Sequence, residues 1–73
     1  MAWDLNRRNQ FAFKSERTGR FFRIDYLEAW QRCRNGEDVY ERILPETSYT
    51  PRDVAKIPWT LVEVPDEVRR PRA

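Results

Sequence analysis

Histidine is absent from this sequence, and cysteine and glycine are scarce. Without imidazole the chain cannot form Ser-His-Asp or Cys-His catalytic arrangements, and it lacks a common zinc ligand. The single cysteine, Cys33, cannot form an intramolecular disulfide or a Cys-x-x-Cys metal knuckle. Two glycines, Gly19 and Gly36, are too few for a phosphate-binding loop or a dinucleotide fingerprint. We therefore expect a protein that is not an enzyme and holds no metal or cofactor.

Long apolar runs are also missing. No apolar stretch approaches the roughly 20 residues that a membrane span needs, and the first residues lack the apolar core of a secretory signal peptide. These features predict a cytoplasmic protein with no membrane partner. A chain of 73 residues has room for one small core, which its ten aromatic side chains can fill. A catalytic pair of carboxylates would need a cleft of roughly 300 to 1,000 Å³, which so small a chain can hardly enclose.

The charge of the chain is distributed unevenly. The formal net charge is +2, but residues 1–24 carry six cations and two anions, a local net charge of +4. Residues 25–73 carry eight cations and ten anions, so the rest of the chain is slightly acidic. Twelve of the fourteen cations are arginine, which suits bidentate contacts with phosphate or carboxylate and stacking on aromatic rings. This pattern predicts a charged partner.

Alternating aromatic and polar side chains indicate a β-hairpin after residue 10. Phe11 and Phe13 lie two residues apart, as do Phe22 and Ile24, so each pair faces one side of a strand. A three-residue connection that ends in Gly19 is typical of a hairpin loop that needs a left-handed residue. The sequence therefore predicts two paired strands joined by this loop.

The clearest helical pattern follows the hairpin. Four side chains share one face at the spacing i, i+3, i+4 and i+7, namely Tyr26, Ala29, Trp30 and Cys33. Asp25 is a suitable N-cap, and Gly36 suits the position where a helix ends. These signals predict a helix over residues 26–35 in which Cys33 packs as a small buried side chain.

The segment 37–44 fits two structures. Val39 and Ile43 are spaced for one face of a helix, as are Tyr40 and Leu44. The alternation from Val39 to Ile43 also fits a strand. We favour a short helix here.

Another helix start is predicted at Thr50, where Pro51 and Asp53 follow the capping residue. The turn that begins there is short and reaches about Ile57. Residues 59–64 have mostly apolar side chains on both faces of a strand, which predicts a strand inside the sheet rather than at its edge.

Together these patterns predict an α+β fold in one small domain. Residues 1–10 are expected to form a flexible N-terminal arm, residues 11–65 the domain, and residues 66–73 a disordered basic tail. We expect the domain to contain a β-hairpin, one main α-helix, short second and third helical turns, and a C-terminal strand.

Aromatic rings and cations are interleaved in the predicted hairpin. The rings are Phe11, Phe13, Phe21 and Phe22, and the cations are Lys14, Arg17, Arg20 and Arg23. Single-stranded nucleic acid is bound by such a combination, because bases stack on rings while cations contact phosphates. The same rings can instead fill the core while the cations lie in solvent, so the sequence leaves two interpretations.

The predicted arm places Trp3 and Leu5 beside Arg7 and Arg8. Tryptophan and arginine are enriched at the centres of protein interfaces, which favours a partner-binding role for these residues. Alternatively, Trp3 folds back onto its own domain. The tail arginines at positions 69, 70 and 72 either attract an acidic surface or simply keep the end of the chain in solvent.

In its length, lack of histidine, aromatic-rich α+β core and basic arm, the chain resembles the small RNA polymerase-binding transcription regulators of lytic Xanthomonas phages. The resemblance covers the whole chain in size and character. It implies a protein that docks on the β′ N-terminal region and the β flap of bacterial RNA polymerase, beside the RNA exit channel. We expect the chain to be a monomer. Such a regulator displaces σ, inhibits initiation, promotes antitermination and acts in the cytoplasm of the bacterial host.

Composition then assigns residue roles within this hypothesis. Trp3, Leu5, Arg7 and Arg8 are expected to anchor the chain on the polymerase. A second group is expected to contact polymerase carboxylates or nascent RNA near the exit channel, and comprises Lys14, Arg17, Arg20 and Arg23. Two alternatives remain, namely a small nucleic-acid-binding module that uses the hairpin and a phage accessory inhibitor of another host protein.

Overall fold

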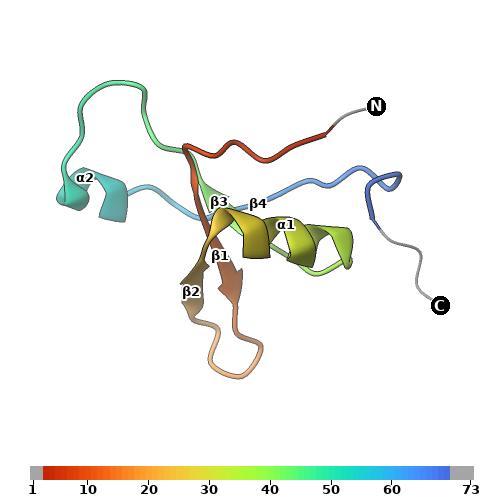
Figure 1. Ribbon diagram of the computed structural model, residues 1–73. Coiled ribbons are helices and arrows are strands. Elements are labelled where there is room, and N and C mark those ends of the chain that lie inside the picture. The colour runs from red at the N-terminus through yellow and green to blue at the C-terminus, as the bar shows by residue number, and fades with distance from the viewer. Residues whose placement is uncertain (1–2, 70–73) are drawn as a thin grey trace.

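The computed structural model describes residues 3–69 (Figure 1). Within this range the chain forms β1 Gln10–Lys14, β2 Phe21–Ile24, α1 Tyr26–Arg34, β3 Tyr40–Arg42, α2 Pro51–Ala55 and β4 Thr60–Leu61. The strands make one antiparallel sheet in the order β2-β1-β3-β4. The predicted fold class, a small α+β domain, is confirmed.

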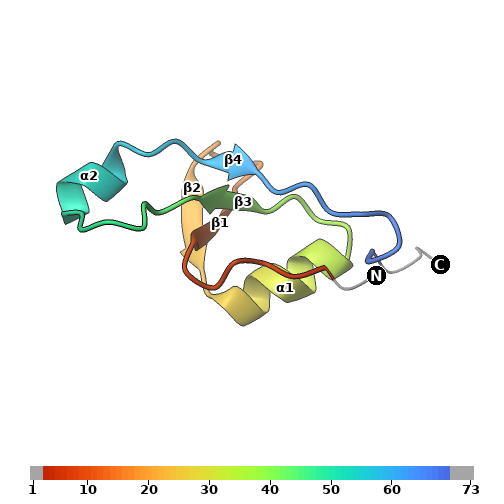
Figure 2. The same ribbon diagram turned by 90° about the horizontal axis from the view of Figure 1, so that it is seen from above.

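The sheet and α1 form two layers. Figure 1 and Figure 2 show α1 on one side of the sheet, whereas α2 stands beyond one end of β3 and β4. The smallest extent of the Cα trace is 16 Å, which fits one helical layer packed on one sheet layer. The core side chains are Leu5, Phe11, Ala29, Cys33, Val39 and Val62.

β1 and β2 form the predicted hairpin. The Ser15 N–H donates to the Arg20 carbonyl and the Gly19 N–H donates to the Ser15 carbonyl, each over 2.8 Å. Gly19 has φ of +73°, the left-handed conformation expected of it. Ser15 and Arg20 close the loop, and the four residues 16–19 lie between them. The connection is therefore one residue longer than expected.

α1 begins and ends close to the predicted residues. Asp25 is its N-cap, and its carboxylate accepts a hydrogen bond of 2.7 Å from the Glu28 N–H. Gly36 follows the helix with φ of +83° and donates its N–H to the Cys33 carbonyl over 3.1 Å. Ala29 and Cys33 are buried, as the shared helical face predicted.

The preference for a helix over residues 37–44 was wrong, because Tyr40–Arg42 forms β3. In the sheet, Tyr40 lies opposite Ala12 of β1 and opposite Leu61 of β4. Val39, directly before the strand, is 1% exposed, and its carbonyl accepts a hydrogen bond from the Val62 N–H. Pairing on both sides satisfies backbone groups that a lone short helix would leave open, so tertiary contacts outweigh the local spacing.

The predicted start of α2 is confirmed. Thr50 accepts a hydrogen bond from the Asp53 N–H, and the Asp53 carboxylate accepts one from the Thr50 N–H, which completes a capping box. The strand predicted over residues 59–64 is shorter, since β4 contains only Thr60–Leu61. Its expected place inside the sheet was also wrong, because β4 is an edge strand.

Residues 3–9 differ from the expected flexible arm, and we call them the N-terminal strap. Leu5 is 5% exposed and belongs to the core, and Trp3 packs against that core. The Asn9 side chain donates to the Glu41 carboxylate over 3.0 Å and so ties the strap to β3. A core this small gains from every large apolar side chain, which explains why the strap docks.

Of the predicted tail, the structure describes residues 66–69, which form a turn. The Val68 N–H donates to the Pro65 carbonyl, and the Arg69 N–H donates to the Asp66 carbonyl. Residues 70–73, with two of the tail arginines, lie outside the described residues. Among residues 3–69, no helix has the length and apolarity needed to cross a membrane.

Candidate functional site: the open face of the sheet

The strand register places two different sets of side chains on the two sides of the sheet. Directly opposed residues share a face, and alternate residues along a strand share it too. The side that faces α1 carries the core residue Phe11. The opposite side, which we call the aromatic face, carries Gln10, Ala12, Lys14, Phe21, Arg23, Tyr40, Arg42 and Leu61.

Three rings from separate segments meet over this face. Phe21 and Tyr40 come from the strands on either side of β1, and their ring centroids are 5.1 Å apart in an edge-on arrangement. The Trp59 ring, just before β4, stacks on Phe21 at 5.8 Å with an angle of 24° between the planes. Ala12 of β1 is small and 0% exposed, so the rings meet above it. Phe21 nevertheless remains 38% exposed, and the face is open to solvent.

Cations border these rings. The Arg42 guanidinium lies 4.1 Å from the centroid of Trp59, and the Lys14 ammonium lies 5.8 Å from that of Phe21. Arg42 is also fixed by hydrogen bonds to the Ile57 carbonyl at 3.1 Å and to the Gln10 side chain at 3.3 Å. The paired strand residues of the aromatic face include three cations, Lys14, Arg23 and Arg42, and no carboxylate. Its local charge is therefore positive.

The strap forms a second cluster at the other side of the molecule, on α1. Trp3 packs edge-on against Trp30 with centroids 5.3 Å apart. The Asp4 carboxylate accepts hydrogen bonds from the Trp30 indole N–H, over 2.6 Å, and from the Tyr26 hydroxyl. These two donors hold the pKa of Asp4 below its ordinary value, because they stabilise the charged form. The Arg7 guanidinium covers the Tyr26 ring at 4.5 Å.

The residues proposed from sequence fall into three places. Lys14 and Arg23 lie on the aromatic face, whereas Arg17 and Arg20 lie in the hairpin loop at one end of β1. Arg7 and Arg8 lie in the strap before the other end of β1, and Trp3 lies at the start of the strap. Leu5 is buried in the core, so it cannot serve as a partner contact while the strap is docked.

Sequence reasoning missed Tyr40 and Arg42 of the aromatic face, and it missed Trp59, whose ring stacks on Phe21 over that face. A strand over residues 39–43 would have placed Tyr40 and Arg42 on one face, but the helical spacing was preferred there. Trp59 was assigned to a strand, yet its partner Phe21 is 38 residues away in sequence, and no local pattern joins the two.

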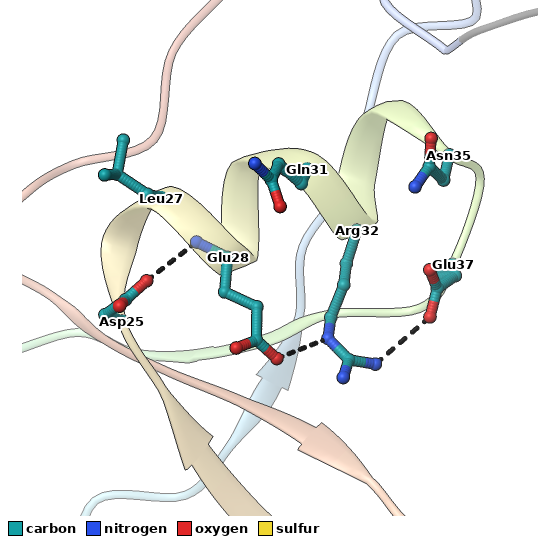
Figure 3. Close-up of a pocket in the computed structure, with 7 residues that line it drawn as sticks. All are labelled: Asp25, Leu27, Glu28, Gln31, Arg32, Asn35 and Glu37. Atoms are coloured by element: carbon teal, nitrogen blue, oxygen red, sulfur yellow. Dashed lines mark hydrogen bonds and ion pairs between the residues drawn. The ribbon is translucent and has the colours of Figure 1, made fainter.

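The surface also has hollows away from the aromatic face. One hollow of about 510 Å³ lies along α1 (Figure 3). Within it, Arg32 forms ion pairs with Glu28 at 2.9 Å and with Glu37 at 3.1 Å, so one guanidinium is shared by two carboxylates. Cys33 lies on the buried face of the same helix, and burial raises the pKa of its thiol to about 11. That thiol is therefore poorly suited to nucleophilic or metal chemistry.

Across the described range 3–69, no group of three or more histidine, cysteine or carboxylate side chains is placed to hold a metal ion. Comparisons with protein families, with curated proteins and with solved structures find no match to this chain. The candidate site accordingly rests on the geometry of the chain itself, and its strongest feature is the positively charged aromatic face.

Proposed function

We propose that this protein is a non-enzymatic transcription regulator that binds bacterial RNA polymerase at the β′ N-terminal region and the β flap. Two observations support the proposal. The first is the resemblance in length and character to polymerase-binding regulators of lytic Xanthomonas phages. The second is the distribution of positive charge over the surface of the fold, which provides contacts for an acidic protein surface.

The charge distribution is the observation that carries the proposal. All six cations among residues 3–24 are exposed: Arg7, Arg8, Lys14, Arg17, Arg20 and Arg23. Within residues 3–69 the ion pairs involve Arg32 alone among the cations, so none of these six is neutralised by a carboxylate there. Exposed arginines that form no internal ion pair are available to carboxylates of another protein, and they accelerate its encounter with the chain.

Docking beside the RNA exit channel would produce both regulatory effects without chemistry. A bound regulator competes with σ for the β flap, so it weakens σ binding by mass action and inhibits initiation. An intrinsic terminator needs an RNA hairpin to fold in the exit channel. A domain bound at that site acts as a wedge that alters the channel, so it opposes this folding and allows elongation to continue, which is antitermination. This proposal places the protein in the cytoplasm of the bacterial host.

The residue roles are revised to fit the packing. Arg8, Arg17 and Arg20 are exposed, so they are the proposed polymerase contacts. In the strap, Trp3 is half-buried and Arg7 is exposed, and both are proposed to add to the polymerase contact through their exposed parts. Leu5 is withdrawn from the contact surface because it fills the core.

The proposal is tested with purified bacterial RNA polymerase and a charge-neutralised variant. We expect the wild-type chain to bind core polymerase, to reduce σ-dependent initiation and to increase read-through of an intrinsic terminator. The triple variant Arg8→Gln, Arg17→Gln, Arg20→Gln should bind about 3-fold to 150-fold more weakly, since rim charges contribute a few tenths to one kcal/mol each.

A matched control changes the same amount of charge elsewhere. Arg34, Arg52 and Lys56 are exposed on or next to the two helices, and their replacement by glutamine should leave polymerase binding within about twofold of the wild type. If the wild-type chain does not bind core polymerase, or if both triple variants weaken binding equally, the proposal is wrong. Binding to polymerase without displacement of σ would also contradict it.

A further inference from the structure

We propose that the aromatic face binds single-stranded nucleic acid, with bases stacked on its rings and phosphates held by its cations. This inference goes beyond the polymerase proposal, because it concerns a ligand that the isolated chain binds. It involves Phe21, Arg42 and Trp59, which the proposed polymerase contacts do not include.

The rings are already ordered in the free protein. Trp59 stacks on Phe21 at 5.8 Å, and Tyr40 packs edge-on against Phe21 at 5.1 Å. A base that stacks on Phe21 therefore meets a ring whose orientation is fixed, and little side-chain entropy is lost on binding. Trp59 covers part of the Phe21 ring, and the 38% of Phe21 that stays exposed is the part that a base can reach.

Arg42 offers a second flat surface. Its guanidinium lies 4.1 Å from the Trp59 ring centroid and is held by the Ile57 carbonyl and the Gln10 side chain. A guanidinium plane fixed in this way can stack on a base as an aromatic ring does. Arg42 also adds positive charge close to the phosphate backbone of a bound nucleic acid strand.

Lys14 and Arg23 are placed to contact phosphates on either side of Phe21. In the register Lys14 is directly opposite Phe21, and Arg23 follows two residues later on the same face of β2. Both are exposed, and neither forms an ion pair within residues 3–69. The other paired strand residues of the face are uncharged, apart from Arg42. Glu37 and Asp38 line the hollow that Lys14 shares with Tyr40, so Arg23 and Arg42 lie on the side of the face more favourable to phosphate.

This combination favours a nucleic acid strand over an acidic peptide. Carboxylates of a peptide would use the cations but would leave the flat rings without a matching planar partner. Bases supply planar partners, and every base has a face that can stack, so binding is expected to be tolerant of sequence. A duplex hides the faces of its bases, so the unpaired strand is the expected ligand.

The experiment measures binding of the full chain to labelled homopolymers by fluorescence anisotropy. The probes are oligouridylate and oligothymidylate of about 12 nucleotides, within the range of 4 to 16 that comparable single domains cover. A duplex of the same length is the third probe. We expect both single strands to bind more tightly than the duplex, and the two single-strand arms show whether RNA or DNA is preferred.

Two neighbouring phenylalanines provide a matched pair of variants. Phe21→Ala should weaken binding between about 5-fold and 150-fold, the range that corresponds to one lost base stack. Phe22 is also exposed, at 46%, but points to the α1 side of the sheet, where it stacks on Phe13. Phe22→Ala should leave the affinity within about twofold. Phe21→Leu keeps apolar volume but removes the ring, so it should weaken binding even if Phe21→Ala is poorly folded.

The salt dependence tests the cations. Lys14→Gln and Arg23→Gln should each reduce the slope of log affinity against log salt by about 0.7, as expected for one lost phosphate contact on a single strand. Arg52→Gln on α2 should leave the slope unchanged.

The proposal is overturned if the isolated chain binds none of the three probes. It is also overturned if Phe21→Ala and Phe22→Ala have equal effects, or if the duplex binds as tightly as the single strands. A chain that binds polymerase but no nucleic acid would overturn this proposal and leave the polymerase proposal standing. Polymerase binding that survives Phe21→Ala, together with lost oligonucleotide binding, would support both proposals separately.

Discussion

At the scale of single residues, Asp4 connects the strap to α1. Its carboxylate accepts hydrogen bonds from both the Tyr26 hydroxyl and the Trp30 indole N–H, which lie one turn apart on the helix. Both donors favour the charged carboxylate, so the pKa of Asp4 is lower in the folded protein than in the unfolded chain. Ionised Asp4 therefore stabilises the docked strap.

We predict that the contribution of Asp4 to stability is lost in acid. A carboxyl group with a lowered folded pKa stabilises the fold above its ordinary pKa of 3.8, and this gain disappears as the pH falls through the lowered value. In urea unfolding, the wild type should therefore exceed Asp4→Asn in stability at neutral pH, and the difference should shrink below about pH 4. Asp38→Asn, at an exposed position, is the control and should show no such trend.

A second prediction concerns Cys33, whose burial raises the pKa of its thiol from 9.0 to about 11. The unfolded chain loses the thiol proton first, so stability falls as the pH rises above 9. Between pH 8 and pH 10 the wild type should lose about 1 kcal/mol of unfolding free energy more than Cys33→Ala does. Urea titrations at both pH values measure this, and an equal loss in both proteins would contradict it.

At the scale of elements, the local sequence sets the ends of the helices and the turn of the hairpin. Asp25 and Thr50 each accept a hydrogen bond from a backbone N–H in the first turn of the helix that follows. Gly19 and Gly36 adopt positive φ where the chain turns. These features depend on neighbours in sequence, and for that reason they can be predicted from sequence patterns.

The hairpin loop provides a test at this scale. A Cβ added at Gly19 would meet nothing within 4 Å, so the cost of a side chain comes only from its left-handed backbone. Gly19→Ala should lower the unfolding free energy by about 1 kcal/mol. Gly19→Asn should cost less, because asparagine tolerates this conformation. Urea unfolding of the two variants measures the difference, and equal costs would show that the loop relaxes to another turn.

At the scale of the whole molecule, the fold is thin and open. The Cα radius of gyration is 13.1 Å, against about 11 Å for a compact chain of this length. One helix covers one side of the sheet, and the other side keeps exposed rings and cations. With a core this small, the strap is part of the hydrophobic interior, and the aromatic face remains available to a ligand.

The role of the strap predicts a large effect of one substitution. Leu5→Ala should cost about 2 to 4 kcal/mol, because it removes a core side chain that is 5% exposed. Total stability in a domain of this size is about 3 to 5 kcal/mol, so the variant should be close to unfolded. Leu27→Ala, at a position 69% exposed on α1, is the matched control and should change little. Circular dichroism and urea unfolding measure both variants.

If Leu5→Ala and Leu27→Ala have the same small effect, the strap is not part of the folding unit. In that case residues 3–9 would behave as the separate arm expected from the sequence.

The sequence by itself determined the α+β class, the hairpin over β1 and β2, and the starts of α1 and α2. It determined these because capping residues, turn glycines and short periodic patterns act between residues that are close along the chain. It also determined the surplus of positive charge in the first third of the chain, which composition alone reveals.

Tertiary structure decided the rest. Residues 40–42 became β3 because β1 and β4 offered hydrogen-bond partners on both sides, although the local spacing also fitted a helix. Leu5 entered the core because a chain of this size has few large apolar side chains to bury. The aromatic face required the sheet itself, since only the strand order brings Phe21, Tyr40 and Trp59 together from distant parts of the sequence.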